Sequence, residues 1–278
     1  MSEKPVPAVL SIAGSDSGGG AGIQADQKAF AACGVHGMTA ITAITAQNTV
    51  GVSRVAPVAP AMIVEQVRAV AEDIGVDAVK IGMLGTSETI DAVVEALGLT
   101  GDPPIVLDPV MVAESGAVLL DPAARRALVE RALPLASVAT PNLAEAGELT
   151  GLGEEATQEE LARAVHALGP DVVVVTGGHT EDGADLFFDG AEAVTIPGPR
   201  HPAGASHGSG CTHSSALAAG LALGESPLEA ARRARELAAA AVEAGLREIG
   251  AGAGPVDALG VAERSRMPSE AARGGGAS

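Results

Sequence analysis

The segment from His207 to Thr212 carries the residue types that most directly suggest chemistry. It reads His-Gly-Ser-Gly-Cys-Thr and stands before an alanine-rich run, 214–223, that we predict to be a helix. Backbone N–H groups at a helix N-terminus lack partners, so a glycine turn there suits a phosphate or another developing anion. The helix dipole should favour the thiolate of Cys211. The competing interpretation of Cys211 is a small buried side chain, the commoner fate of a free cysteine.

A second glycine-rich turn lies near the N-terminus, at residues 14–22, and reads Gly-Ser-Asp-Ser-Gly-Gly-Gly-Ala-Gly. No Gly-Lys-Ser/Thr follows it, so it is not a P-loop. Asp26, four residues further on, is either a functional carboxylate or a side chain that complements the dipole of its helix. Two such turns in one chain point to phosphoryl chemistry on a small molecule.

Polar side chains also follow or interrupt apolar runs. Gln47 stands at the carboxyl end of an expected strand, where ligands bind in open α/β sheets. Its amide can present a donor and an acceptor to a heterocycle, whereas the neighbouring Asn48 suits a turn that holds local backbone. Lys80 lies within an apolar run, where its charge must be paired or must reach the surface.

Carboxylates recur after two later strands. Asp108 follows one of them, and the other leads into Asn142 with Glu145 three residues later. Asn142 and Glu145 also fit a helix capping box. The functional interpretation is oxygen ligation of a Mg²⁺ ion, partly through water, as Mg²⁺ accompanies a nucleotide.

Strand-like and helix-like runs alternate along the chain and predict a mostly parallel sheet covered on both faces. Strands are expected at 9–13, 38–46, 78–81, 105–107, 138–140, 172–175, 186–188 and 193–196, the last two as a hairpin. Helices are expected at 21–33, 61–74, 87–97, 122–133, 158–168 and 214–223. With no internal repeat or linker, we expect one domain over 6–261 and a disordered C-terminal tail over 262–278.

Composition narrows the class of protein. Hydrophobic residues make up 47% of the 278 residues, which allows a substantial core. A net charge of -18 argues against nucleic acid or an anionic membrane as partner, and no apolar run is long enough to span a bilayer. Two cysteines cannot form a disulfide framework, and the N-terminus lacks a secretory signal. We therefore expect a cytoplasmic protein.

Taken together, the segments resemble the hydroxymethylpyrimidine/phosphomethylpyrimidine kinases of thiamine biosynthesis, a branch of the ribokinase-like superfamily. The motifs that carry the resemblance occur in family order over roughly 9–219. They are Gly14 to Asp26, Thr45 to Thr49, Lys80 to Leu84, Leu107 to Met111, Thr140 to Leu143 with Glu145, Gly177 to His179, and His207 to Thr212.

The resemblance implies a three-layer α/β/α sandwich, a homodimer, and ATP with Mg²⁺. It implies phosphorylation of 4-amino-5-hydroxymethyl-2-methylpyrimidine on its hydroxymethyl group and then on the resulting phosphate. By motif position, the pyrimidine would meet Gln47, Asp26, Gly14, Ala21, Met83 and Val110. The nucleotide side would use Asn142, Glu145, Thr176 and Lys80, with Asp108 and Glu145 at the metal. An anion hole would comprise Gly208, Ser209, Gly210 and Cys211.

Cys211 stands where sugar-kinase relatives carry an aspartate base. The first acceptor is an alcohol that must lose a proton, whereas the second is a phosphate monoester, already largely ionised with a second pKa of about 6. A cysteine can be neutral or anionic, which suits both steps.

The chain departs from the family pattern at Thr176, where a lysine is common, mildly at Ser209, and further at His213 and over residues 250–259. Two other functions stay open at this point: a pyridoxal or pyridoxine kinase on a similar scaffold, and a ligand-binding sensor that has lost catalysis.

Overall fold

The computed structural model describes residues 5–178, 183–202 and 204–266. Its main sheet has eight strands in the order β10-β9-β8-β7-β6-β5-β1-β2. Neighbours from β2 to β8 run parallel, and β9 and β10 form the expected antiparallel hairpin at one edge. The strands of this sheet are β1 Ala8–Ala13, β2 His36–Ile41, β5 Ala78–Ile81, β6 Ile105–Leu107, β7 Val138–Ala139, β8 Val172–Val175, β9 Asp185–Phe188 and β10 Ala193–Ile196.

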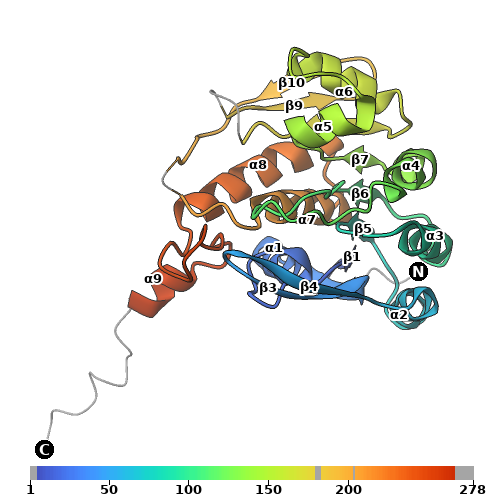
Figure 1. The fold of residues 1–278 in the computed structure, drawn as a ribbon, viewed down its shortest axis with the longest axis horizontal. Coiled ribbons are helices and arrows are strands. Elements are labelled where there is room, and N and C mark those ends of the chain that lie inside the picture. Colours follow the sequence, from blue (N-terminus) through green and yellow to red (C-terminus); the bar gives the residue numbers. More distant parts are fainter. Residues whose placement is uncertain (1–4, 179–182, 203, 267–278) are drawn as a thin grey trace, which may run out of the picture.

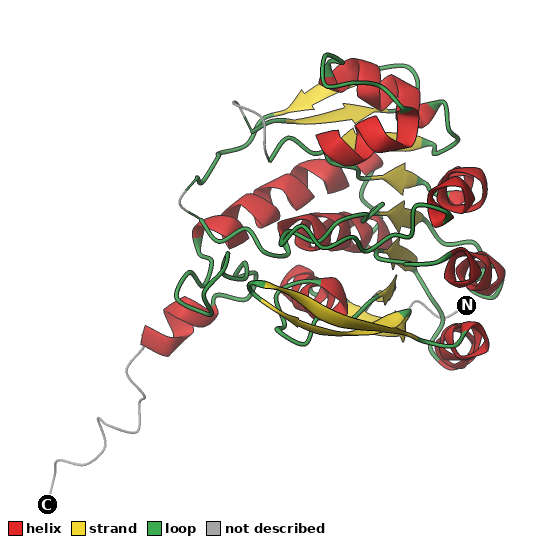
Figure 2. Ribbon diagram, viewed as in Figure 1, coloured by secondary structure: helices red, strands yellow, loops and turns green. Residues whose placement is uncertain are grey.

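Helices cover both faces of the sheet, as Figures 1 and 2 show. Their bounds are α1 Gly22–Cys33, α2 Pro60–Asp73, α3 Ser87–Leu97, α4 Ala124–Ala127, α5 Leu143–Thr150, α6 Gln158–His166, α7 Ser209–Ala222, α8 Pro227–Glu243 and α9 Val261–Arg266. Successive strand residues point to opposite faces of the sheet and so belong to two hydrophobic cores. Val9 lies in the core between the sheet and α1, α7 and α8, and Leu10 lies in the core between the sheet and α2, α3 and α6. The three-layer sandwich implied by the resemblance is confirmed.

The expected strand 38–46 is two strands. The chain leaves the main sheet at Thr42, whose buried hydroxyl donates to the carbonyl of Met83 at 2.8 Å. β3 Ala43–Asn48 then pairs antiparallel with β4 Gly51–Pro57 in a separate ribbon beside α1 (Figure 1). β4 was not predicted, because it is a largely exposed edge strand that ends in a proline and shows no apolar alternation.

Other boundaries also differ. The expected helix 122–133 is an α-helical turn, α4, continued by a π-helical segment Leu128–Ala132. α7 begins at Ser209, five residues before the expected start, and α8 was not predicted. The expected tail begins with α9, which ends at Arg266, and the rest of the tail lies outside the described residues. In the described part of the chain, no helix has the length and apolar character needed to cross a membrane.

Candidate active site

A cavity of about 450 Å³ lies at the carboxyl ends of the parallel strands. Strands β1, β5, β6, β7 and β8 contribute residues at or just after their carboxyl ends, because parallel strands end on the same side of a sheet. Of the residues proposed from sequence, all except Asp26 line this cavity: Gly14, Ala21, Gln47, Lys80, Met83, Asp108, Val110, Asn142, Glu145, Thr176, Gly208, Ser209, Gly210 and Cys211. His179, part of one motif, lies outside the described residues.

The first glycine-rich turn joins β1 to α1 and is organised by Asp16. The carboxylate of Asp16 accepts the backbone N–H groups of Gly18 at 2.8 Å, Gly20 at 3.0 Å and Ala21 at 2.9 Å. Gly22 has a φ of 55°, and a Cβ there would lie 2.3 Å from the carbonyl oxygen of Gly14. Because these N–H groups donate to Asp16 within the same turn, they are not available to bind a phosphate.

The second glycine turn leads into α7, and two of its backbone N–H groups remain available to bind an anion. Gly208 caps α7 at a φ of 86° with no side-chain cap. The N–H of Ser209 donates to Ser206, but those of Gly210 and Cys211 have no acceptor within the described residues. These two donors stand at a helix N-terminus on the cavity wall, which is the arrangement expected of an anion hole.

The thiol of Cys211 is protonated in the free protein. Burial raises its pKa to about 12, against the nearby ammonium of Lys80, and the charges of Asp26 and Asp108 add to the rise. This direction is opposite to the one expected from the helix dipole, because the cost of desolvating a thiolate exceeds what the helix terminus contributes. Cys211 therefore meets an incoming phosphate as a neutral group.

Asp26 and Lys80 form a buried ion pair beneath the cavity floor. Their charged atoms lie 2.9 Å apart, and both side chains are 0% exposed. The carboxylate of Asp26 also accepts the hydroxyls of Ser11 at 2.6 Å and Ser215 at 2.8 Å. Burial would lower the pKa of Lys80, but the charges of Asp26 and its neighbours, Asp108 among them, together with the hydrogen bond to Asp26 raise that pKa above its usual value.

The expected contact between Asp26 and the pyrimidine is therefore corrected. The side chain lies behind the cavity wall and is committed to three partners from β1, β5 and α7. Lys80 does reach the cavity wall, but its ammonium donates to Asp26. The sequence identified Lys80 as a charge that must be paired or reach the surface, and the structure pairs it with Asp26.

Gln47 presents its side chain to the cavity near the end of β3. A β-bulge lies between Ala46 and Gln47, and the backbone of Gln47 exchanges hydrogen bonds with the hydroxyl of Ser17. The amide oxygen accepts the hydroxyl of Thr45 at 3.3 Å, while its nitrogen has no partner among residues that the structure describes. Asn48 holds the following turn by accepting the N–H groups of Val50 and Gly51, which confirms its structural role.

Asp108 and Glu145 both line the cavity, and both acids have raised pKa values. Burial raises the pKa of Asp108 despite the charge of Lys80, and burial together with the charge of Asp108 raises that of Glu145 to about 8. Glu145 and Asn142 also complete the capping box of α5. A divalent cation would relieve the repulsion between the two carboxylates, so the donor set fits Mg²⁺.

Asp108 and Glu145 fit a cation whose other ligands are oxygens from outside the protein. Among the described residues there is no cluster of three or more His, Cys, Asp or Glu side chains arranged to hold a metal. Two carboxylates would leave the remaining positions to water and phosphate oxygens, which is how Mg²⁺ is usually bound with a nucleotide.

Sequence reasoning missed a second polar cluster at the far end of the cavity. Asp185, at the start of β9, lies 3.1 Å from the imidazole of His213 and 3.8 Å from the guanidinium of Arg235. Its carboxylate also accepts the N–H of Gly177 at 2.9 Å. The only sequence signal was His213, noted as a departure from the family pattern, because the three side chains come from elements far apart in the chain.

Comparison with solved structures defines the class of protein. Bacillus subtilis pyridoxal kinase, solved in complex with ADP, is similar with a TM-score of 0.84 and 37% identity, over 92% of this chain and 99% of that one. Together, the fold, the cavity at the strand ends and the anion hole define a ribokinase-like kinase that acts on a small molecule.

Sequence relatives define the family. The phosphomethylpyrimidine kinase family matches residues 16–257, and the chain belongs to this family. A hydroxymethylpyrimidine/phosphomethylpyrimidine kinase of Rhizobium meliloti (strain 1021) is 51% identical over 253 residues, 89% of this chain and 95% of its own length. A pyridoxine kinase of Bacillus subtilis (strain 168) is 40% identical over 242 residues, 84% of this chain and 89% of its own length.

Proposed function

We propose that this chain transfers the γ-phosphoryl group of ATP to 4-amino-5-hydroxymethyl-2-methylpyrimidine, and then phosphorylates the monophosphate to the diphosphate. The observation that carries this proposal is the N-terminus of α7, on the wall of a cavity that also presents Gln47. There the N–H groups of Gly210 and Cys211 have no acceptor in the described part of the chain. Family membership and the names of the relatives support the substrate.

The cavity residues proposed from sequence have separate tasks in this reaction. The amide of Gln47 would orient the pyrimidine edge, with Met83 and Val110 as apolar walls beside it. The N–H groups of Gly210 and Cys211 would bind the transferring phosphoryl group, where negative charge accumulates. A neutral thiol at Cys211 adds no charge that would repel the monophosphate acceptor of the second step.

On the nucleotide side, Asn142, Glu145 and Thr176 would contact the ATP phosphates, and Asp108 with Glu145 would hold Mg²⁺. When bound, Mg²⁺ neutralises negative charge on the phosphoryl oxygens. Thr176 can offer a hydroxyl but no charge. We also propose that the protein works as a homodimer in the cytoplasm, and the two free cysteines, Cys33 and Cys211, suit a reducing compartment.

The test is a direct assay of the purified chain with ATP, Mg²⁺ and the hydroxymethylpyrimidine. ADP release and product mass are followed together, and the expected result is the monophosphate followed by the diphosphate. A separate reaction that starts from the monophosphate isolates the second step. Absence of any phosphorylated pyrimidine would contradict the proposal.

The relative named pyridoxine kinase favours a second candidate, since pyridoxine also carries a hydroxymethyl group on a nitrogen heterocycle. Turnover with pyridoxine and pyridoxal, measured beside the pyrimidine, separates the two kinases. We expect a higher kcat/KM for the pyrimidine. If neither heterocycle were phosphorylated but one of them bound in calorimetry, the chain would be a sensor.

A further inference from the structure

Asp16 and Glu114 carry carboxylates on two segments that border the cavity from different sides. Asp16 is 1% exposed and holds the first glycine-rich turn together. Glu114 lies 98 residues further along, in the loop that follows β6 and carries Val110, and it is 37% exposed. Neither carboxylate belongs to the acidic pair assigned to Mg²⁺.

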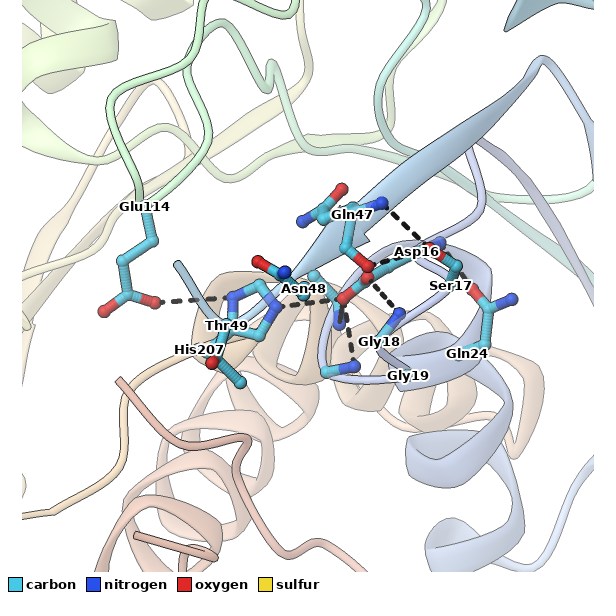
Figure 3. Close-up of polar contacts among 12 residues, drawn as sticks. Asp16, Ser17, Gly18, Gly19, Gln24, Gln47, Asn48, Thr49, Glu114 and His207 are labelled. Carbon is cyan, nitrogen blue, oxygen red and sulfur yellow. Dashed lines mark hydrogen bonds and ion pairs between the residues drawn. The ribbon is translucent and has the colours of Figure 1, made fainter. Parts of the chain in front are cut away.

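His207 lies between these two carboxylates (Figure 3). Its Nε2 atom is 2.9 Å from Asp16 Oδ2, and its Nδ1 atom is 3.7 Å from Glu114 Oε2. The neighbouring hydroxyl of Ser206 also donates to Glu114. The imidazole therefore has one carboxylate at each nitrogen, an arrangement that only the doubly protonated ring satisfies with both N–H groups.

The backbone around His207 is fixed as well. The N–H of His207 donates to the carbonyl of Gly254 at 3.2 Å, and its carbonyl accepts the N–H of Val256 at 3.1 Å. The two glycine turns touch at this point: a Cβ on Gly20 would lie 2.1 Å from the imidazole, and one on Gly208 would lie 1.8 Å from the carbonyl oxygen of Gly20. His207 is thus followed directly by the anion hole and packs against the turn that lines the other side of the cavity.

We propose that His207 is a positioning residue for phosphoryl transfer: its imidazolium joins the Asp16 turn to the N-terminus of α7 and, through Glu114, fastens the loop after β6 over the cavity. This inference rests on the proposed kinase function. The ion pair sets the separation between the anion hole and the pyrimidine subsite, on which in-line transfer depends. His207 itself contacts no reacting atom.

The charge of His207 makes this role depend on pH. Its hydrogen bond to Asp16, with a second contribution from Glu114, raises its pKa from 6.5 to about 9. Other charged groups around it are engaged elsewhere: Lys28 on α1 donates to the carbonyl of Gly19, and Asp257 accepts N–H groups at the start of α9. A raised pKa in the folded state means that the contribution of His207 is complete below pH 6.5 and is lost as the pH rises through about 9.

The first experiment compares kcat and KM for the pyrimidine between pH 6 and 10 in the wild type and in His207→Gln. Glutamine is neutral and cannot donate to both carboxylates. We expect kcat/KM to fall by up to about 100-fold at neutral pH, the cost of misplacing a bound acceptor by about an ångström. The alkaline decline near pH 9 should disappear. His36→Gln, at an exposed histidine at the amino end of β2, away from the strand ends that border the cavity, is the matched control and should leave the profile unchanged.

Two outcomes would overturn the proposal. His207→Gln could retain the wild-type kcat/KM, or it could lose activity only in proportion to its unfolded fraction while keeping the alkaline decline. The second outcome would assign His207 a structural role alone. If His207→Gln does not fold, Glu114→Gln takes its place: it should move the alkaline decline to lower pH, because one of the two acids that hold the proton is gone, and an unmoved decline would overturn the proposal.

An NMR titration keeps this test separate from the kinase assignment. The imidazole of His207 should titrate near pH 9 in the wild-type protein without substrate, and at lower pH in Glu114→Gln. Titration of His207 near its ordinary value in the wild type would overturn the inference even for an active kinase. Titration near pH 9 in a protein that phosphorylates no pyrimidine would instead contradict the proposed function and leave the ion pair in place.

Discussion

At the scale of single residues, environment rather than residue type decides what each cavity group does. Cys211 has the reactive side chain, but burial raises its pKa and favours the thiol, whereas the amide nitrogen of Gln47 at the cavity has no partner among the described residues. Asp108 and Glu145 repel each other and so fit a cation. The chemistry of the site therefore rests on neutral donors, backbone N–H groups and a pair of acids.

Gln47→Leu tests the pyrimidine contact. The substitution replaces the amide of Gln47 with an apolar side chain of similar size. The polar groups of the pyrimidine would then lose their hydrogen-bond partner, so we expect pyrimidine binding to weaken by about 1–3 kcal/mol. ATP affinity should stay nearly constant, because the nucleotide side of the cavity is formed by other elements. Calorimetry with each ligand measures both. Equal losses in the two affinities would indicate that Gln47 supports the fold rather than the substrate.

Cys211→Ala tests the thiol in each step separately. If Cys211 takes up the alcohol proton, the first phosphorylation should slow by about 10²-fold or more, whereas the second should lose much less because its acceptor is already ionised. Rates measured from the alcohol and from the monophosphate provide the comparison. An equal drop in both steps would rule out the base and leave Cys211 as part of the anion hole.

At the scale of elements, the site is a contact between two strand-to-helix turns. The turn before α1 is closed by Asp16, and the turn before α7 leaves the N–H groups of Gly210 and Cys211 without an acceptor among the residues that the structure describes. Glycine is required where they meet, because Gly208 has a φ of 86° and no room for a side chain against Gly20. The shape of the anion hole is therefore set jointly by segments about 190 residues apart.

Gly208→Ala should show this dependence. Backbone strain at a positive φ costs about 1–3 kcal/mol of stability, and the contact with Gly20 adds to it and displaces the anion hole. Gly224→Ala is a matched control, because Gly224 has the same φ of 86° but nothing within 4 Å of the added Cβ. Thermal unfolding and kcat should be measured for both variants. Similar effects from the two would mean that only the backbone conformation matters.

At the scale of the whole molecule, one buried ion pair connects the central elements. Asp26 on α1 receives Ser11 of β1, Lys80 of β5 and Ser215 of α7, so its carboxylate joins the sheet to two helices on the same face. Removal of one partner from such a pair leaves a buried charge without compensation.

Lys80→Met is expected to lower the free energy of unfolding by about 3–5 kcal/mol, the usual cost of breaking a buried pair from one side. Arg68→Met is the control: its Nε atom lies 3.3 Å from Glu65, but the two side chains are 40% and 64% exposed, so the loss should be below about 1 kcal/mol. Urea denaturation provides both values. A small loss for Lys80→Met would mean that Asp26 is readily protonated or solvated when it is left alone.

The sequence by itself determined that helices cover both faces of a mostly parallel sheet. It also identified many of the residues that line the cavity. Buried strands such as Val172–Val175 are unbroken apolar runs, and the motif residues follow the strands directly, so a parallel sheet must gather them at one edge. Local signals also fixed the capping box at Asn142. β4 was missed because an exposed ribbon carries no comparable pattern.

Only the tertiary structure decided which charges meet. Asp26 pairs with Lys80, 54 residues away, and Asp16 with His207, 191 residues away. No local sequence pattern indicates these pairings, because residues so far apart in the chain meet only when the helices and strands pack together. The protonation of Cys211 likewise depends on burial and on charges from other elements, which cancel what its place on the helix alone would give. Spacing along the chain names the candidates for a site, and packing assigns their partners and their charge.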